Sequence, residues 1–164
     1  MPLPTGPTAE LERIFRAIRT NYLRITNSNG FYTNVGFVDE IDGEVRDEDH
    51  RENRASLLIY DDGDDYEYRT AGDVRGFNTY RVMGWISDSP PDRLRLVFRK
   101  FQRDFWVAHH YDLSLALADA VNGNAGSRLV TTHNIVSIRR FYQPPEAIFV
   151  ARVEFAYDFN SDET

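Results

Sequence analysis

The residues closest to a catalytic or metal-binding arrangement are His109, His110 and Asp112, with His50 and His133 elsewhere in the chain. Zinc enzymes activate water with imidazole and carboxylate ligands, so this set could serve a small metal-assisted hydrolase. Adjacent histidines on a helix point about 100° apart, however, and do not easily bind one ion. We therefore expect the two histidines to cap a helix end or lie at the surface, and we assign no metal ligand.

A second candidate is the acidic run Asp61, Asp62, Gly63, Asp64 and Asp65. It lacks the alternating D-x-D-x-D-G spacing and the distal glutamate of a calcium loop. Any two carboxylates of such a run could be chosen as the catalytic pair of a hydrolase, so the run is not evidence for hydrolysis. The favoured interpretation is a solvated hairpin or loop.

The motifs of the common enzyme classes are missing from the sequence. It contains no G-x-S-x-G, P-loop, dinucleotide fingerprint or zincin motif. With 0 cysteines, the chain has no disulfide, no thiolate catalysis and no cysteine-ligated metal. We therefore expect no catalytic residue and no cofactor, and a protein that is not an enzyme.

The composition is that of a single globular domain. Of 164 residues, 41% are hydrophobic and 13% aromatic, enough for a sizeable core. No apolar run approaches the roughly 18 residues of a membrane span, and the first residues do not form a signal peptide. We expect a soluble domain over residues 8–159, an extended tail at 1–7 and a frayed end at 160–164, with no membrane association.

Charge is segregated along the chain. The net charge of −7 disfavours general nucleic-acid binding. Half of the 26 acidic residues lie between Asp39 and Glu67, and 18 of the 19 basic residues are arginine. Arginine pairs carboxylates bidentately, which favours contact between acidic and basic parts of neighbouring subunits, although GC-rich codon usage explains the excess equally well. An anionic module that mimics nucleic acid through residues 39–67 is another alternative.

Residues 91–108 have the pattern of an amphipathic helix. One face is apolar: Leu94, Val97, Phe98, Phe101, Phe105 and Ala108. The other face is basic: Arg93, Arg95, Arg99, Lys100 and Arg103. Aromatic and basic residues therefore take different sides, unlike a nucleic-acid stacking surface. Trp106 falls off the apolar face, so we expect Arg95, Arg99, Arg103 and Trp106 to contact a subunit or partner. Burial under residues 113–128 is the alternative for Trp106.

The remaining patterns predict an α+β fold. A first amphipathic helix begins near Thr8, carries apolar residues to Ile25 and ends at Asn29-Gly30. Strands are predicted at 31–41, 55–60, 77–86, 129–140 and 147–159, with a charged loop at 42–54. A short helix at 113–121 either stands alone or continues the second long helix. The order predicts a two-layer sandwich with a mixed or antiparallel sheet of about five strands and two long helices on one face.

The plan of the chain resembles a known family. The stretch 29–36, NGFYTNVG, resembles the N-G-Y-x-T-D-V-G-like turn of tail terminator (tail-completion) proteins of long-tailed bacteriophages. Strands like ASLLIYDDGDD and YRVMGWI follow, then a helix opened by SPPD and two terminal strands, so the resemblance covers residues 8–159. The segments 42–54 and 109–128 are longer than the corresponding segments expected in this family. Neck and connector proteins of the same virions share small α+β designs and are the alternative family.

The resemblance implies a structural role in the virion. Tail terminators form a hexameric ring that caps the tail tube, stops its elongation and offers the surface that joins the head. The implied partners are further copies of the chain, the tube protein and a head–tail connector or neck protein, while DNA passes through the channel without specific binding. The implied location is the head-proximal end of the tail, and the host cytoplasm during assembly. We expect Asp61, Asp62, Asp64 and Asp65 near the ring axis or the tube-facing rim.

Overall fold

The computed structural model describes residues 7–40, 55–70, 72–87, 92–112 and 130–160. The predictions for the N-terminal tail before residue 7, the loop at 42–54, the helix at 113–121 and the end after 160 lie outside these ranges. The described helices are α1 (Pro7–Leu23), the 3₁₀ turn η1 (Asn27–Asn29), α2 (Leu94–Val107) and the π-helical turn η3 (Ala108–Asp112). The strands are β1 (Val35–Glu40), β2 (Ala55–Thr70), β3 (Asp73–Ser87), β4 (Thr132–Gln143) and β5 (Glu146–Asn160).

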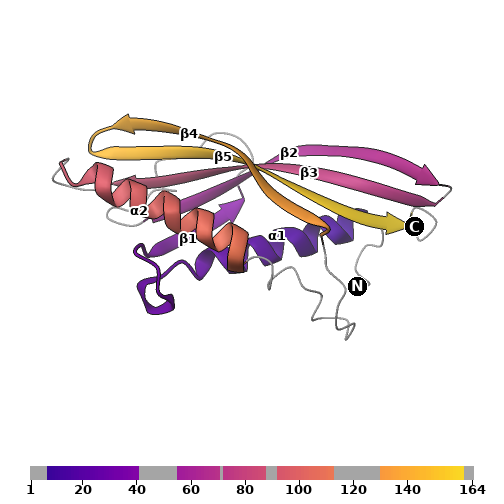
Figure 1. The fold of residues 1–164 in the computed structure, drawn as a ribbon, viewed down its shortest axis with the longest axis horizontal. Coiled ribbons are helices and arrows are strands. Elements are labelled where there is room, and N and C mark those ends of the chain that lie inside the picture. Colours follow the sequence, from indigo (N-terminus) through magenta and orange to yellow (C-terminus); the bar gives the residue numbers. More distant parts are fainter. Residues whose placement is uncertain (1–6, 41–54, 71, 88–91, 113–129, 161–164) are drawn as a thin grey trace.

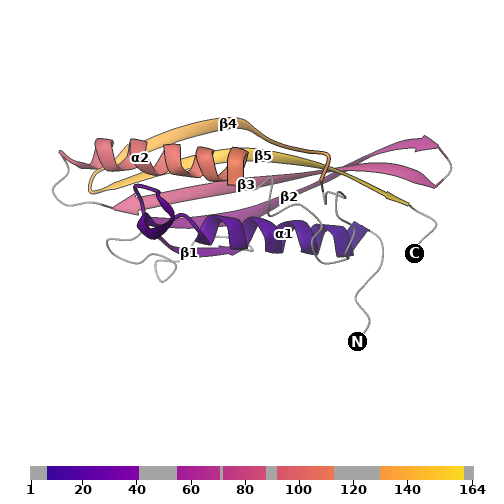
Figure 2. The same cartoon turned by 60° about the horizontal axis from the view of Figure 1, so that its bottom comes forward.

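The strands form one five-stranded sheet in the order β1-β2-β3-β5-β4. Among the described strands, only the β1–β2 pair is parallel; β3 pairs antiparallel with β2 and β5, and β4 pairs antiparallel with β5. Both long helices cover the same face of the sheet (Figures 1 and 2). The predicted two-layer α+β sandwich with a mixed sheet is therefore confirmed.

The core lies between the helices and this face. Helix α1 buries Ile14, Ile18 and Tyr22 completely. Helix α2 buries four residues of the predicted apolar face and covers Val97 only in part: Leu94, Phe98, Phe101 and Phe105 are the buried four. Phe149 of β5 is central to the core, because three aromatic rings of α2 surround it at centroid distances of 5.0–6.1 Å. The ring of Phe149 lies directly over Gly84 of β3, where a Cβ atom would be 2.1 Å from it. Glycine at this position lets the aromatic layer approach the sheet.

The acidic run at residues 61–65 is part of a β-hairpin, one of the two predicted alternatives, and not a loop, because it lies within strand β2. Strand β2 runs through this segment to Thr70, and β3 begins at Asp73 rather than at Phe77. A β-bulge between Asp61 and Asp64, with Gly63 at a φ of 102°, accommodates the run without ending the strand. The chain turns back only at Gly72, whose φ is 88°. Backbone pairing with β3 therefore overrides the low strand propensity of aspartate.

Other boundaries differ from the predictions by a few residues. Helix α1 begins at Pro7 and ends at Leu23, and Gly30, at a φ of 86°, ends the following 3₁₀ turn. Helix α2 begins at Leu94 and continues as a π-helical turn to Asp112, so the helix runs on past Ala108. Strand β4 lies three residues later than predicted at each end. In the described ranges, no helix has both the length and the apolar character of a membrane span.

A basic groove between helix α2 and strand β4

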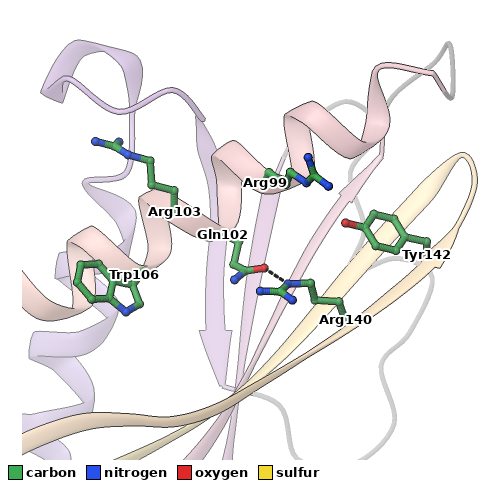
Figure 3. Close-up of a pocket in the computed structure, with 6 residues that line it drawn as sticks. All are labelled: Arg99, Gln102, Arg103, Trp106, Arg140 and Tyr142. Carbon is green, nitrogen blue, oxygen red and sulfur yellow. Dashed lines mark hydrogen bonds between the residues drawn. The ribbon is translucent and has the colours of Figure 1, made fainter.

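The candidate site is a groove of about 610 Å³ between α2 and β4, which we call the basic groove. Figure 3 shows the six residues that line it: Arg99, Gln102, Arg103, Trp106, Arg140 and Tyr142. The first four follow the i, i+3, i+4, i+7 spacing of one helix face. The last two are two residues apart on β4, so they point to the same side of the strand.

Tyr142 forms one wall of the basic groove, where its ring contacts one aromatic ring and one cation. Its ring lies edge-on to buried Phe98, with the centroids 5.0 Å apart. The guanidinium carbon of Arg95 lies 5.8 Å from the same ring, a cation–π contact. On the floor, Arg140 Nε donates a hydrogen bond to Gln102 Oε1, which links β4 to α2 (Figure 3).

Arg103 is fixed at the opposite end, near η1. Its guanidinium carbon lies 5.0 Å from the centroid of the Tyr32 ring, and its Nη1 lies 3.4 Å from Asp104 Oδ1. Asp104 is fully buried and accepts a hydrogen bond of 2.8 Å from the backbone N–H of Thr33. Burial raises the pKa of Asp104, while the hydrogen bonds and Arg103 lower it in part. This network ties α2 to the connection between η1 and β1.

The side chains that line the basic groove carry positive charge, which favours an anionic partner. Three guanidinium groups line it, and none of its six lining residues is acidic. Trp106 and Tyr142 are 43% and 41% exposed, so each offers an uncovered aromatic surface beside these cations. Arginine forks bind carboxylates or phosphates in a bidentate manner, and exposed aromatic residues are enriched at protein interfaces. The arrangement suits a carboxylate-rich protein surface.

The structure brings together three of the four residues that the sequence predicted for an interface. Arg99, Arg103 and Trp106 line the basic groove, and Arg95 lies behind its Tyr142 wall. Sequence reasoning missed Gln102, Arg140 and Tyr142. The alternation of Ile138, Arg140 and Tyr142 marks one face of a strand, but nothing in the sequence places that strand beside α2. The interface role of the four residues stays a prediction.

The four predicted aspartates lie on β2, and three of them have partners within the chain. Asp64 Oδ1 and Asp61 Oδ1 accept hydrogen bonds of 2.7 and 3.3 Å from Nδ2 of buried Asn78. Asp62 pairs with Arg81 at 2.8 Å, on the face of the sheet opposite the helices. Asp65 lies one residue beyond Asp64 and is exposed. The run therefore presents carboxylates to both faces of the strand, and its position near a ring axis stays a prediction.

Of the two adjacent histidines, His109 does not lie where the sequence predicted. His109 is fully buried, because the π-helical turn carries it into the core, and its Nδ1 is 2.9 Å from the hydroxyl of Tyr22. Burial, with smaller contributions from His133 and His110, lowers the pKa of His109 to about 3. The ring of His110 packs on Trp106, with the centroids 4.5 Å apart. Among the described residues, no three His, Asp or Glu side chains are grouped to hold a metal ion.

Comparison with known proteins adds no relative: no protein-family model matches the chain, and no curated protein matches it significantly. The interpretation of the basic groove therefore depends on its own residues and on their place in the fold.

Proposed function

We propose that this protein is a non-enzymatic virion subunit, a tail terminator of a long-tailed bacteriophage. Its copies form a ring that caps the tail tube, stops tube elongation and provides the surface that joins the head. The turn sequence at residues 29–36 and the order of elements support the family, because both follow the pattern described for tail terminators. A hexamer is the ring size that this resemblance implies.

The observation that carries the proposal is the separation of opposite charges on an elongated subunit. The basic groove lies on α2 and the C-terminal half of β4, toward one end of the long axis (Figure 1). The acidic segment of β2 runs toward the other end. A closed ring of identical subunits needs two different, mutually complementary surfaces on each copy. Opposite charges at separate places meet this requirement and disfavour symmetric pairing of like surfaces.

The net charge also suits a ring around a DNA channel. At −7, the chain as a whole repels phosphate, which favours passage of DNA over binding. The basic groove is the exception, and contact with a carboxylate-bearing neighbour would neutralise it within the assembly.

Electron microscopy tests the proposal directly. The purified protein is imaged alone and after mixing with phage tail tubes. We expect six-fold rings, and tubes that are capped at one end and no longer elongate. A persistently monomeric protein that leaves tube growth unchanged contradicts the proposal. Rings that bind isolated neck complexes but leave tube ends open would assign the protein to the neighbouring neck instead.

A further inference from the structure

We propose that neighbouring copies join by edge-to-edge strand pairing, with β4 of one copy against residues 61–70 of β2 in the next. This contact rests on the proposed ring and names the strands that build it. We call residues 61–70 the distal half of β2. The occupant of each edge is a second copy of this chain.

The first argument is that the described sheet has two long open edges. Strand β1 pairs with β2 only between Ala55 and Ile59, so the distal half has β3 as its sole partner among the described strands. Strand β4 pairs along its length with β5, and no described strand lies on its outer side. An open edge presents a row of unpaired N–H and C=O groups, which templates pairing with another chain.

The second argument is charge complementarity between the two edges. The distal half of β2 carries five acidic residues and one basic residue: Asp61, Asp62, Asp64, Asp65, Glu67 and Arg69. Strand β4 carries Arg139 and Arg140 and no acidic residue. Like charges directly opposite each other destabilise a strand pair, whereas opposite charges stabilise it. Two β4 edges or two β2 edges would repel, so the favoured pair is β4 with β2.

The third argument is that exposed apolar side chains gather on the same edges. Among the described residues, nine large hydrophobic side chains are exposed, and five of them belong to these two segments. The five are Tyr66, Tyr68, Val136, Phe141 and Tyr142. Aromatic and β-branched residues form the most favourable cross-strand pairs, and exposed clusters of them mark interaction surfaces. Pairing of the two edges would cover them.

Strand direction is also compatible. Each step from β2 to β3, β5 and β4 is antiparallel, so β4 runs opposite to β2. A second copy that continues the sheet in the same orientation therefore presents its β2 antiparallel to β4. Because β1 occupies the edge of β2 as far as Ile59, the neighbour must be displaced along the strands. Such a stagger tilts the strands relative to the assembly axis, which is the geometry of closed sheets.

Cysteine cross-linking tests this pairing, and the chain suits it because it has 0 cysteines. A panel combines Asp65→Cys, Tyr66→Cys or Tyr68→Cys on β2 with Ser137→Cys, Arg139→Cys or Phe141→Cys on β4. We expect mixtures of one β2 and one β4 single variant to form disulfide-linked dimers on oxidation. A chain with both substitutions should form a ladder of higher oligomers. Single variants alone should remain monomeric on a non-reducing gel.

Imaging the same samples separates this inference from the proposed function. Rings that form without any β2–β4 cross-link overturn the edge pairing and leave the proposed ring intact. A β4 variant that cross-links to itself also overturns it, because it shows symmetric pairing. Cross-linked ladders that do not cap tail tubes support the edge pairing and reject the tail terminator. Absence of rings, cross-links and capping rejects both.

A charge exchange provides a second test that needs no disulfide. Arg139 lies on the face opposite the helices, as does Asp65, so the two can meet when the sheet continues. Arg139→Glu should raise the concentration needed for assembly by roughly tenfold, because attraction becomes repulsion. Adding Asp65→Arg to the same chain should restore assembly. Loss of assembly in the double variant, or unchanged assembly in Arg139→Glu, contradicts the edge pairing.

Discussion

His109 is a titratable residue held without charge in the core, and it makes stability depend on pH. Its pKa is lowered to about 3 in the folded protein, against an ordinary value of 6.5. The unfolded chain therefore binds more protons below pH 6.5, and stability falls as the pH decreases through this window. Each pH unit costs up to about 1.4 kcal/mol, so acidification from pH 7 to pH 5 should lower the free energy of unfolding by about 2 kcal/mol.

Denaturant unfolding of His109→Gln across this pH range checks the prediction. Glutamine retains a polar partner for the Tyr22 hydroxyl and does not titrate, so the slope between pH 5 and 7 should flatten. His110, whose pKa burial also lowers, contributes in the same direction. His110→Gln is therefore the control and should keep most of the slope. An equally steep slope in both variants would show that His109 is not the group responsible.

Gly84 is the second residue with a specific steric role. A Cβ atom there would meet the Phe149 ring at 2.1 Å, and that ring is enclosed by α2. Gly84→Ala should lower the free energy of unfolding by about 1–3 kcal/mol, because the aromatic layer must shift away from the sheet. Thr79→Ala, on the same strand but on the other face, is the control. Chemical denaturation of both variants measures the difference, and equal losses would contradict a steric cause.

At the scale of elements, Asp104 joins α2 to the connection between η1 and β1 by a hydrogen bond. Its buried carboxylate accepts a hydrogen bond from the N–H of Thr33, and Asp104→Ala leaves that donor unpaired. We expect a loss of about 1–3 kcal/mol in the free energy of unfolding. Because burial already raises the pKa of Asp104, an uncharged acceptor is tolerated there, and Asp104→Asn should cost less. Thermal unfolding of both variants tests this order; an asparagine variant as unstable as the alanine variant would contradict it.

The spacing of apolar residues predicts those helices and strands that bury one face, because the spacing matches the period of the element. The apolar faces of the two long helices are confirmed, because burial along a helix repeats at the helical period, and the strand predicted at 147–159 is present as β5. The acidic half of β2 was missed, since aspartate is rare in strands and only pairing with β3 holds it extended. Three of the six residues that line the basic groove were predicted from the sequence, and the other three were not. Helical spacing groups Arg99, Arg103 and Trp106, whereas Arg140 and Tyr142 join them only through the order of the sheet.

At the scale of the whole molecule, the basic groove should matter to assembly and not to folding. Arg99 and Arg103 are exposed on α2, and the cation–π contact of Arg103 with Tyr32 lies at the surface. The double change Arg99→Glu and Arg103→Glu should therefore leave the fold intact and lower the free energy of unfolding by about 1–2 kcal/mol, mostly because Arg103 no longer pairs with buried Asp104. The same change replaces two positive charges by two negative charges, which should repel an acidic neighbour.

The control for this prediction makes the same change in net charge elsewhere. Arg16 and Arg24 are exposed on or just after α1 and do not line the basic groove, so Arg16→Glu with Arg24→Glu adds equal negative charge outside it. Mass photometry at physiological ionic strength compares the oligomers of both double variants with the parent. We expect loss of rings only for the Arg99 and Arg103 pair, with unchanged circular dichroism. Normal ring formation by that pair would show that the basic face of α2 is merely solvated, and that the contact lies elsewhere.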